Sequence, residues 1–505
     1  MEEVLEALHR EASPTKHSHI RFACTQARDV LESQVGLLRS PPHQLRALCL
    51  AALQGALETR QSKLVTLAVS GYYKLLRDTQ FHSGYEEDDD STWLAAQVLA
   101  SLHSLPHHTE DTQVDLLKVV LNMSCVAGVS SSGQLVTQVV GVCGLAWGRG
   151  GAPLRTAAQA AASQAIAQLV RQLKEESEEQ EKLYLRGSQR RKKKEEEEEE
   201  EGKRKEEEEE EDYDFIAPAF DESVPIINFV AEKLMDVKRL EDSKKGAEIP
   251  ALYLLECVKT LLACLALPET LAHLHKPSEG VSSTPASGTP SYCSTLFTTS
   301  LWQRLCPALV ALLGTPTSHR LARASGRTEG QMGRGSGCMA HPAPLFNNQQ
   351  ARAIYSVVCG LVVTMGGVGE MRPVLESLLH RMLLYPPPQC RQDALKAVTE
   401  LLGNPTKLVQ LAGPILYPDP RNPHQNDMAL FRLVMDSLGE CAGCGEGGVR
   451  GVLVGAVGGL LGSLERLTQG HALSKHQVGL TNALYAALQD GDYSGHSFLH
   501  RATHI

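Results

Sequence analysis

The stretch from Ser40 to Leu76, SPPHQLRALCLAALQGALETRQSKLVTLAVSGYYKLL, decides the fold because two apolar helical patterns follow each other directly. Within each pattern the apolar side chains recur at intervals of three and four residues, which places them on one face of a helix. The connector between them, Glu58–Ser62, is about five residues long, so the two helices must pack nearly antiparallel. The sequence therefore predicts a helical hairpin. Its apolar positions are Leu45, Leu48, Cys49, Ala52, Leu53, Ala56 and Leu57, then Leu64, Leu67, Ala68, Tyr72, Leu75 and Leu76.

Composition extends this prediction to the whole chain of 505 residues. Only 5% of the residues are aromatic, and leucine and alanine dominate the apolar set. Few segments show the period-two alternation of branched and aromatic residues that strands need. We therefore expect an all-α fold, an α-solenoid-like stack of helical hairpins of the armadillo or HEAT type.

Shifts in composition predict the domain organisation. Two helical blocks are separated by a charged, low-complexity linker, and two Gly/Ser/Thr/Pro-rich gaps that we expect to be disordered interrupt the second block. The predicted parts are a first block at 1–183, a linker at 184–222, a second block at 223–490 with gaps near 276–291 and 315–348, and a tail at 491–505.

The linker lies in a run from Lys174 to Asp214 that is almost wholly charged and cannot bury enough apolar area to fold as a domain. Pairs of Glu and Lys could make part of it helical. Its basic cluster, Arg190–Lys194, has the composition of a nuclear-import signal. Because acids outnumber bases around it, a solvated charge run is the favoured interpretation.

Glycine marks two features of the second block. The sequences Leu-Leu-Gly-Thr-Pro at 312–316 and Leu-Leu-Gly-Asn-Pro at 401–405 predict identical helix ends, in which glycine forms a left-handed cap and proline forbids continuation. Near the C-terminus five glycines are spaced for one helix face, where a neighbouring helix can approach closely. These are Gly448, Gly451, Gly455, Gly459 and Gly462. Because no Lys-Ser or Lys-Thr pair follows them, a phosphate-binding loop is disfavoured.

Nothing in the sequence resembles a signal peptide, since Met1–Arg10 is charged and amphipathic. The apolar run Val452–Leu464 is too short to span a bilayer. Most of the thirteen cysteines lie within apolar helical patterns, as expected for reduced core thiols. We therefore expect a soluble cytoplasmic protein with no transmembrane segment. The net charge of −10 argues against nucleic acid as a partner.

The sequence contains few patterns that are typical of catalytic or metal-binding sites. Cys441 and Cys444 have metal-ligand spacing, but no second pair lies nearby to complete a zinc site. No Gly-x-Ser-x-Gly elbow, His-Glu-x-x-His helix or Walker loop is present. We expect no catalytic, cofactor-binding or metal-binding residues, and no enzyme activity. An enzyme whose site is assembled from dispersed residues is the rival hypothesis.

Several segments resemble the N-terminal regulatory part of the large Arf guanine nucleotide-exchange factors. They are Leu53–Glu58, Lys63–Val65, Tyr73–Leu76, Thr112–Leu121 and the alanine-rich Thr156–Leu173. Together they make residues 1–180 similar to the dimerisation and cyclophilin-binding domain of that family. A second set resembles one member more closely, of which the most specific is the tri-proline segment Leu383–Gln389. The second block is similar to the helical region upstream of the family's exchange domain.

Two departures from the family pattern stand out. The Asn-Tyr-Asp-Cys box is missing around Leu411–Pro420, and no Phe-Arg-x-x-Gly-Glu motif of the exchange domain is present. The resemblance therefore implies a non-catalytic regulatory or scaffold region acting in Arf signalling and vesicle-mediated transport. It implies self-association as a homodimer or higher oligomer, binding of Arf or Arf-like small GTPases or other trafficking proteins, and peripheral attachment to Golgi or secretory-vesicle membranes, including secretory granules. A generic armadillo- or HEAT-like adaptor unrelated to Arf is the alternative.

The candidate contact face lies on the hairpin of the opening stretch. Five residues are placed to flank an apolar groove there: Arg60, Lys63, Tyr72, Tyr73 and Lys74. The alternative is that the tyrosines are ordinary core residues.

Overall fold

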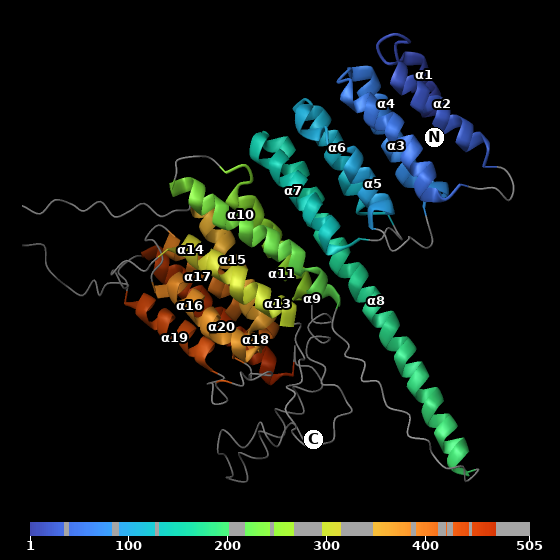
Figure 1. Ribbon diagram of the computed structural model, residues 1–505. Helices are drawn as coiled ribbons and strands as arrows, with labels where there is room; N and C mark the ends of the chain where they lie inside the picture. Colours follow the sequence, from blue (N-terminus) through green and yellow to red (C-terminus); the bar gives the residue numbers. More distant parts are fainter. Residues whose placement is uncertain are drawn as a thin grey trace, which may run out of the picture. The chain divides into compact units, whose positions relative to one another are not determined.

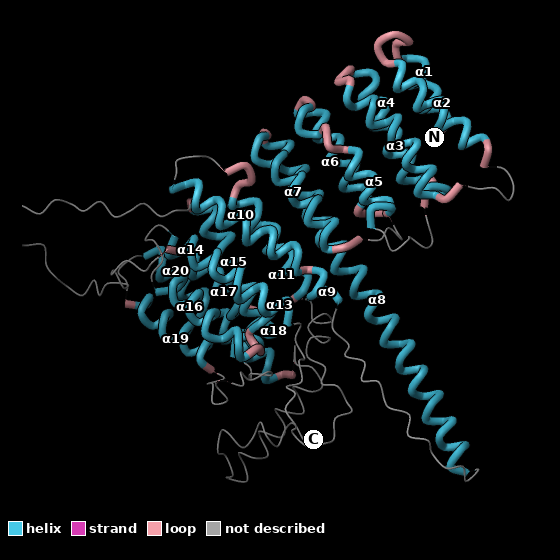
Figure 2. Tube along the Cα trace, viewed as in Figure 1, coloured by secondary structure: helices cyan, strands magenta, loops and turns pink. Residues whose placement is uncertain are grey.

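The computed structural model describes residues 1–34, 40–82, 90–126, 131–200, 218–242, 247–266, 295–314, 347–384, 390–412, 421, 428–443 and 447–470. Across these ranges the chain forms helices and loops and no strand (Figure 2). The prediction of an all-α, solenoid-like fold is confirmed. The two expected disordered gaps fall almost wholly outside the described residues.

The predicted hairpin consists of α3 (Pro42–Glu58) and α4 (Ser62–Arg77). Pro42 begins α3, a position where the missing N–H of proline leaves no hydrogen bond unmade. The connector needs only three residues because Arg60 takes a left-handed conformation, with φ of 55°. Thr59 closes the preceding turn by donating its hydroxyl to the carbonyl of Ala56 at 2.7 Å.

Contacts between helices divide the chain into two units, 1–308 and 309–505. In the first unit, α1 packs with α2, α2 with α3, α3 with α4, and α7 with α8, while α5 lies against α3 and α6 against α4 (Figure 1). The remaining helices of this unit are α1 (Glu2–Glu11), α2 (Ser18–Glu32), α5 (Leu94–Ser101), α6 (Glu110–Met123), α7 (Gly133–Arg149), α8 (Ala152–Glu200), α9 (Pro218–Glu222), α10 (Val224–Asp242), α11 (Ala251–Leu265), α13 (Thr295–Ser300) and the start of α14 (Cys306–Leu313), with a π-helical turn at Leu301–Leu305 and short 3₁₀ turns at Thr79–Phe81, Asp90–Thr92 and Leu105–His107.

Close approach of α3 and α4 depends on one small residue. Leu53 of α3 is fully buried, and its Cδ2 lies 2.4 Å from where a Cβ on Gly71 of α4 would stand. The leucine side chain thus fills the space that the glycine leaves empty. Shape matching of this kind is what sets the distance between packed helices.

The helices that follow the charged run, α10 and α11, pack against helices that precede it. Tyr253 of α11 is fully buried and donates its hydroxyl to the carbonyl of Val140 on α7 at 2.8 Å. A Cβ on Gly144 of α7 would lie 2.9 Å from the ring of Tyr253. The helices α10 and α11, which composition assigned to the second block, therefore pack on α7 and α8. The predicted domain boundaries remain a prediction.

The second unit is a separate helical bundle. Its largest packed pair is formed by α17 and α20, and α15 and α18 both contact α17. Its helices are the end of α14, then α15 (Asn348–Met365), α16 (Arg372–Leu384), α17 (Arg391–Leu402), α18 (Pro405–Ala412), α19 (Ala429–Ala442) and α20 (Gly447–Thr468), with a 3₁₀ turn at Gly369–Met371.

The two predicted helix ends differ in conformation. Gly314 has φ of +76°, the left-handed cap that the sequence predicts. Gly403 instead has φ of −77° and stays right-handed, so that prediction was wrong for this position. The reason is Asn404, whose side chain accepts hydrogen bonds from the backbone N–H groups of Thr406 and Lys407. It thereby caps α18, which starts at once with Pro405.

The glycine series lies on α20, as predicted, but the neighbouring helix α17 approaches only two of the five glycines closely. A Cβ on Gly459 would stand 3.2 Å from the Cα of Gly403, so two backbones meet here. Gly448 faces the side chain of Gln392. Around the other three glycines of the series there is open space within 4 Å.

Replacing Leu53 by Asp will unfold the first unit, because a carboxylate would enter a fully buried site. The expected loss is at least about 3 kcal/mol of the free energy of unfolding, a large part of typical domain stability. Ala51→Asp, at an exposed position of the same helix, is the matched control. Circular dichroism during urea titration measures both. A fully helical Leu53→Asp protein with an unchanged midpoint would contradict the packing of α3.

Adjacent glycines on α20 provide a second test. Gly458→Ala adds a methyl group into open space and should stabilise the helix by up to about 1 kcal/mol. Gly459→Ala gains the same propensity but pushes against the backbone of Gly403, so its net effect should be destabilising. The difference between the two thermal midpoints is the readout. Equal midpoints would show that α17 and α20 do not meet at Gly459.

Candidate interaction surface

The five predicted contact residues do not share one face in the structure. Tyr72 is fully buried, and its hydroxyl donates to Oγ of Ser101 at 2.9 Å. Burial raises the pKa of Tyr72 well above its usual value. Ser101 in turn donates to the carbonyl of Val98 at 2.6 Å. Tyr72 is therefore a core residue that joins α4 to α5, which matches the alternative interpretation.

Tyr73, the next residue, is half-buried on the side of α4 that contacts α6. Partial burial raises the pKa of its hydroxyl, while the charge of Lys118 on α6 acts in the opposite direction. Lys118 itself forms an ion pair with Asp115 at 2.9 Å. The exposed part of Tyr73 thus borders a polar seam between two helices.

The two lysines of the set connect α4 to α1. Nζ of Lys74 lies 2.7 Å from Oε2 of Glu3, and Nζ of Lys63 lies 3.8 Å from Oε2 of Glu11. The Lys74 ammonium lowers the pKa of Glu3, first through their hydrogen bond and then through its charge. Because these pairs are solvent-exposed, each contributes little to stability. The lysines can therefore exchange these partners for another acidic group at little cost.

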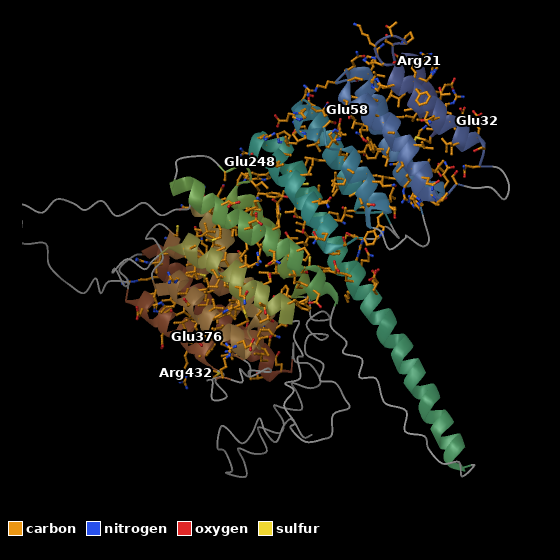
Figure 3. The ribbon with its side chains drawn as sticks, viewed as in Figure 1. Arg21, Glu32, Glu58, Glu248, Glu376 and Arg432 are labelled. Atoms are coloured by element: carbon orange, nitrogen blue, oxygen red, sulfur yellow. The ribbon has the colours of Figure 1, made fainter. Side chains whose placement is uncertain are left out.

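Arg60 lies at the end of the hairpin, in the connector between α3 and α4. Its side chain is exposed, and its charge contributes to lowering the pKa of His108, for which burial is the larger cause. At the same end, Nε2 of His103 lies 3.5 Å from Oε1 of Glu58, which Figure 3 labels on α3. The structure thus places Arg60 and Lys63 at one end of α4, with Lys74 at the other.

A second surface feature was not predicted from the sequence. A groove of about 430 Å³ runs along α7 and α8, lined by Trp147, Arg155, Thr156, Gln159, Ala160 and Ser163. The guanidinium of Arg155 stands over the Trp147 ring, 4.9 Å from its centroid. The Tyr253 ring also packs against this tryptophan, tilted by 44°, with ring centroids 6.3 Å apart. Tryptophan and arginine are the side chains most enriched at the energetic centres of protein interfaces.

The signal for this groove was present in the sequence but was weak. Trp147 is one of three tryptophans in the chain, and it lies only eight positions before Arg155. What the sequence could not show is that the turn at Gly150–Gly151 folds α8 back beside α7 and brings the two side chains together. Pairing across a turn depends on its geometry and not on spacing along one helix.

The described ranges hold no group of three His, Cys, Asp or Glu side chains placed to bind a metal ion. Cys441 is buried at the end of α19, while Cys444 lies outside the described residues. Burial raises the pKa values of the Cys49 and Cys257 thiols to about 12, which makes them poor nucleophiles. Most of the cysteines that the structure describes are buried and suited to packing, while Cys125 is exposed.

Two helical stretches are long and apolar enough to qualify as membrane spans by length and composition. They are Leu296–Leu313 and Gly447–Thr468, with 50% and 22% of their windows buried. Core helices of soluble proteins pass the same test. The expectation of no transmembrane segment therefore stays a prediction.

Together these features of the described residues define a solenoid-like helical protein with exposed polar boundaries between helices and an aromatic groove. Over 514 residues, or 97% of this chain, it is 32% identical to the human (Homo sapiens) brefeldin A-inhibited guanine nucleotide-exchange protein 3. Its identity to the mouse (Mus musculus) protein of the same name is 31% over 513 residues. The resemblance to a large Arf guanine nucleotide-exchange factor, inferred above from short segments, is confirmed.

The chain spans about a fifth of the length of these two relatives, since the match covers 21% of each. No family model matches the chain. No solved structure matches it either.

The Tyr72–Ser101 hydrogen bond can be measured with a double-mutant cycle. Tyr72→Phe should cost about 1 kcal/mol of the free energy of unfolding, because a buried hydroxyl partner is lost. Ser101→Ala should cost a similar amount, and the double variant less than the sum, with a coupling of about 0.5–1 kcal/mol. Urea denaturation of the full chain is the measurement. Strict additivity would place the two hydroxyl groups out of contact.

Proposed function

We propose that this chain is a non-catalytic scaffold region of an Arf guanine nucleotide-exchange factor-like protein. The observation that carries the proposal is the similarity to the exchange protein over 97% of the chain, combined with a fold made of stacked helices. Such folds act by presenting long surfaces to other proteins. The chain covers only a fifth of its relatives and shows no exchange motif, so we infer that it does not itself catalyse nucleotide exchange.

The proposed partners are Arf or Arf-like small GTPases, and the proposed contact is the exposed end of the α3–α4 hairpin. Arg60 and Lys63 are solvent-exposed there, and Lys63 is only loosely paired with Glu11, at 3.8 Å. An acidic patch on a partner would be attracted to these two cations, and the attraction would speed association. Tyr73 and Lys74 continue this proposed surface along α4, toward the C-terminal end of the helix. Tyr72 is left out of this surface because it is buried.

Self-association of the first unit and peripheral attachment to Golgi or secretory-vesicle membranes complete the proposal. Both come from the resemblance to the exchange-factor family. A scaffold that binds membrane-anchored GTPases and a second copy of itself would be concentrated on a vesicle surface by multivalency. Its role in vesicle-mediated transport would follow from that concentration.

The test is capture of purified small GTPases by the immobilised full chain. Arf and Arf-like proteins are each loaded with GDP or with a non-hydrolysable GTP analogue. We expect selective capture of at least one GTP-loaded member. The double variant Arg60→Glu/Lys63→Glu should weaken capture about tenfold or more, because it reverses two interfacial charges.

Two controls sharpen this experiment. Arg149→Glu reverses an exposed charge on α7, away from the hairpin, and should leave capture unchanged. Trp147→Ala tests whether the groove on α7 and α8 takes part. Equal capture by the wild-type chain and the Arg60→Glu/Lys63→Glu variant would remove the hairpin from the interface. Capture of no GTPase would favour the generic helical adaptor.

A further inference from the structure

The second unit exposes an apolar helix face that its own packing does not use. On α20, four large apolar side chains point to solvent. Their exposed fractions are 72% for Val454, 40% for Val457, 62% for Leu461 and 44% for Leu464. A neighbouring strip of α20 is buried through Val449, Ala456, Leu460 and Ser463, and the helix packs mainly on α17. The exposed residues form a second apolar strip beside the buried one, and the described helices leave this second strip uncovered.

The spacing of the exposed side chains is that of a coiled-coil seam. The positions 454, 457, 461 and 464 follow one another at intervals of three, four and three residues, the alternation of a and d positions in a heptad. Gly451, Gly455 and Gly458 lie beside this seam with open space around them. Small residues flanking an apolar seam let a second helix backbone approach closely.

Charged residues at the two ends of the seam indicate which kind of partner can bind to it. Arg450 lies one turn before Val454, and Glu465 directly follows Leu464. A helix with the same sequence, lying antiparallel, brings its own Glu465 near Arg450 and its Arg450 near Glu465. A parallel arrangement would place like charges together, which is unfavourable. Arg450 already takes part in a polar or electrostatic interaction of its own chain, so the intermolecular pair would be additional.

We propose that the seam Val454–Leu464 on α20 docks against the same seam of a second copy of this chain, with the two helices antiparallel. In this register Val454 packs against Leu464 of the second copy, and Val457 packs against Leu461. Each layer joins one valine with one leucine, and a two-fold axis relates the two halves of the interface. Self-complementarity of this kind is what an isologous dimer contact requires.

A membrane surface fits this face less well. Helices that lie in a membrane interface typically combine a polar face rich in Lys and Arg with Trp or Phe on the apolar face. No aromatic residue occurs in α20, and its charged residues are Arg450, Glu465 and Arg466. Arg466 is already used within the unit, since it donates to the carbonyl of Gly403 at 2.7 Å.

The proposed contact differs from the GTPase surface and from self-association of the first unit. It involves only residues of the second unit. Because three turns of helix bury an area at the low end for specific interfaces, we expect a weak dimer that adds to other contacts by avidity.

The test measures self-association of the full chain by sedimentation equilibrium over a range of concentrations. Leu461→Asp places a charge at the centre of the seam and should raise the dissociation constant at least about 30-fold, the effect of losing a central interface residue. Phe22→Asp, at a position that is 66% exposed on α2, is the matched control and should leave the constant unchanged. Equal dissociation constants for Leu461→Asp and the wild type would overturn the proposal.

Charge reversal tests the antiparallel register. Arg450→Glu and Glu465→Arg should each weaken self-association by about fivefold, because each replaces two attractive pairs with two repulsive ones. The double variant should recover wild-type association, since the attraction is restored with reversed sign. Failure of the double variant to recover would rule out the antiparallel arrangement.

Two further readouts identify other occupants. If Leu461→Asp lowers the thermal midpoint without changing self-association, another part of the same chain covers the seam and the proposal fails. If it instead abolishes pelleting with anionic lipid vesicles, a membrane is the occupant and the proposal fails as well. GTPase capture by the same variant is measured in parallel. Retained capture would show that only the α20 contact had been tested.

Discussion

Burial of short aliphatic side chains between helices joined by tight connectors is the constraint on which the rest of the structure depends. With few aromatic residues, the chain cannot fill space between distant helices, so the helices must come close. The contact of Leu53 with Gly71 shows how this is achieved, since one helix offers a branched side chain and the other a bare backbone. A glycine likewise makes room for the Tyr253 ring at Gly144, and at Gly459 and Gly403 two glycines let the backbones themselves approach. Packing at this distance leaves polar side chains on the seams between helices, where partners can reach them.

The candidate surface on the first unit follows from that arrangement. Because the apolar stripe of α4 is buried, its charged residues emerge at the borders with α1 and at the connector. Lys63 and Lys74 pair with acids at opposite ends of α1, which holds the first helix antiparallel to α4. Exposed pairs of this kind add little stability, so they orient the helix while leaving the cations available.

Sequence periodicity was sufficient to predict the hairpin and the all-α class, because both depend on local spacing. It also placed Tyr72, and not Tyr73, in the apolar stripe of the second helix. Grouping the two tyrosines in one contact face conflicts with that stripe, because neighbouring positions on a helix differ by about 100°. What spacing along one helix cannot show is a contact between helices, such as the hydrogen bond from Tyr72 to Ser101 on α5. The same limit applies to Trp147 and Arg155, which a turn brings together, and to Gly403, whose conformation depends on the cap that Asn404 supplies to the next helix.

The continuity of α8 has a mechanical consequence. Its alanine-rich first half packs with α6 and α7, and the same helix runs on without a break through the charged run to Glu200 (Figure 1). At 1.5 Å per residue, the stretch 177–200 alone reaches about 36 Å. A run of charged residues that composition assigns to a linker therefore continues α8 as regular helix as far as Glu200, and the helical rise separates the backbone at its two ends by that distance.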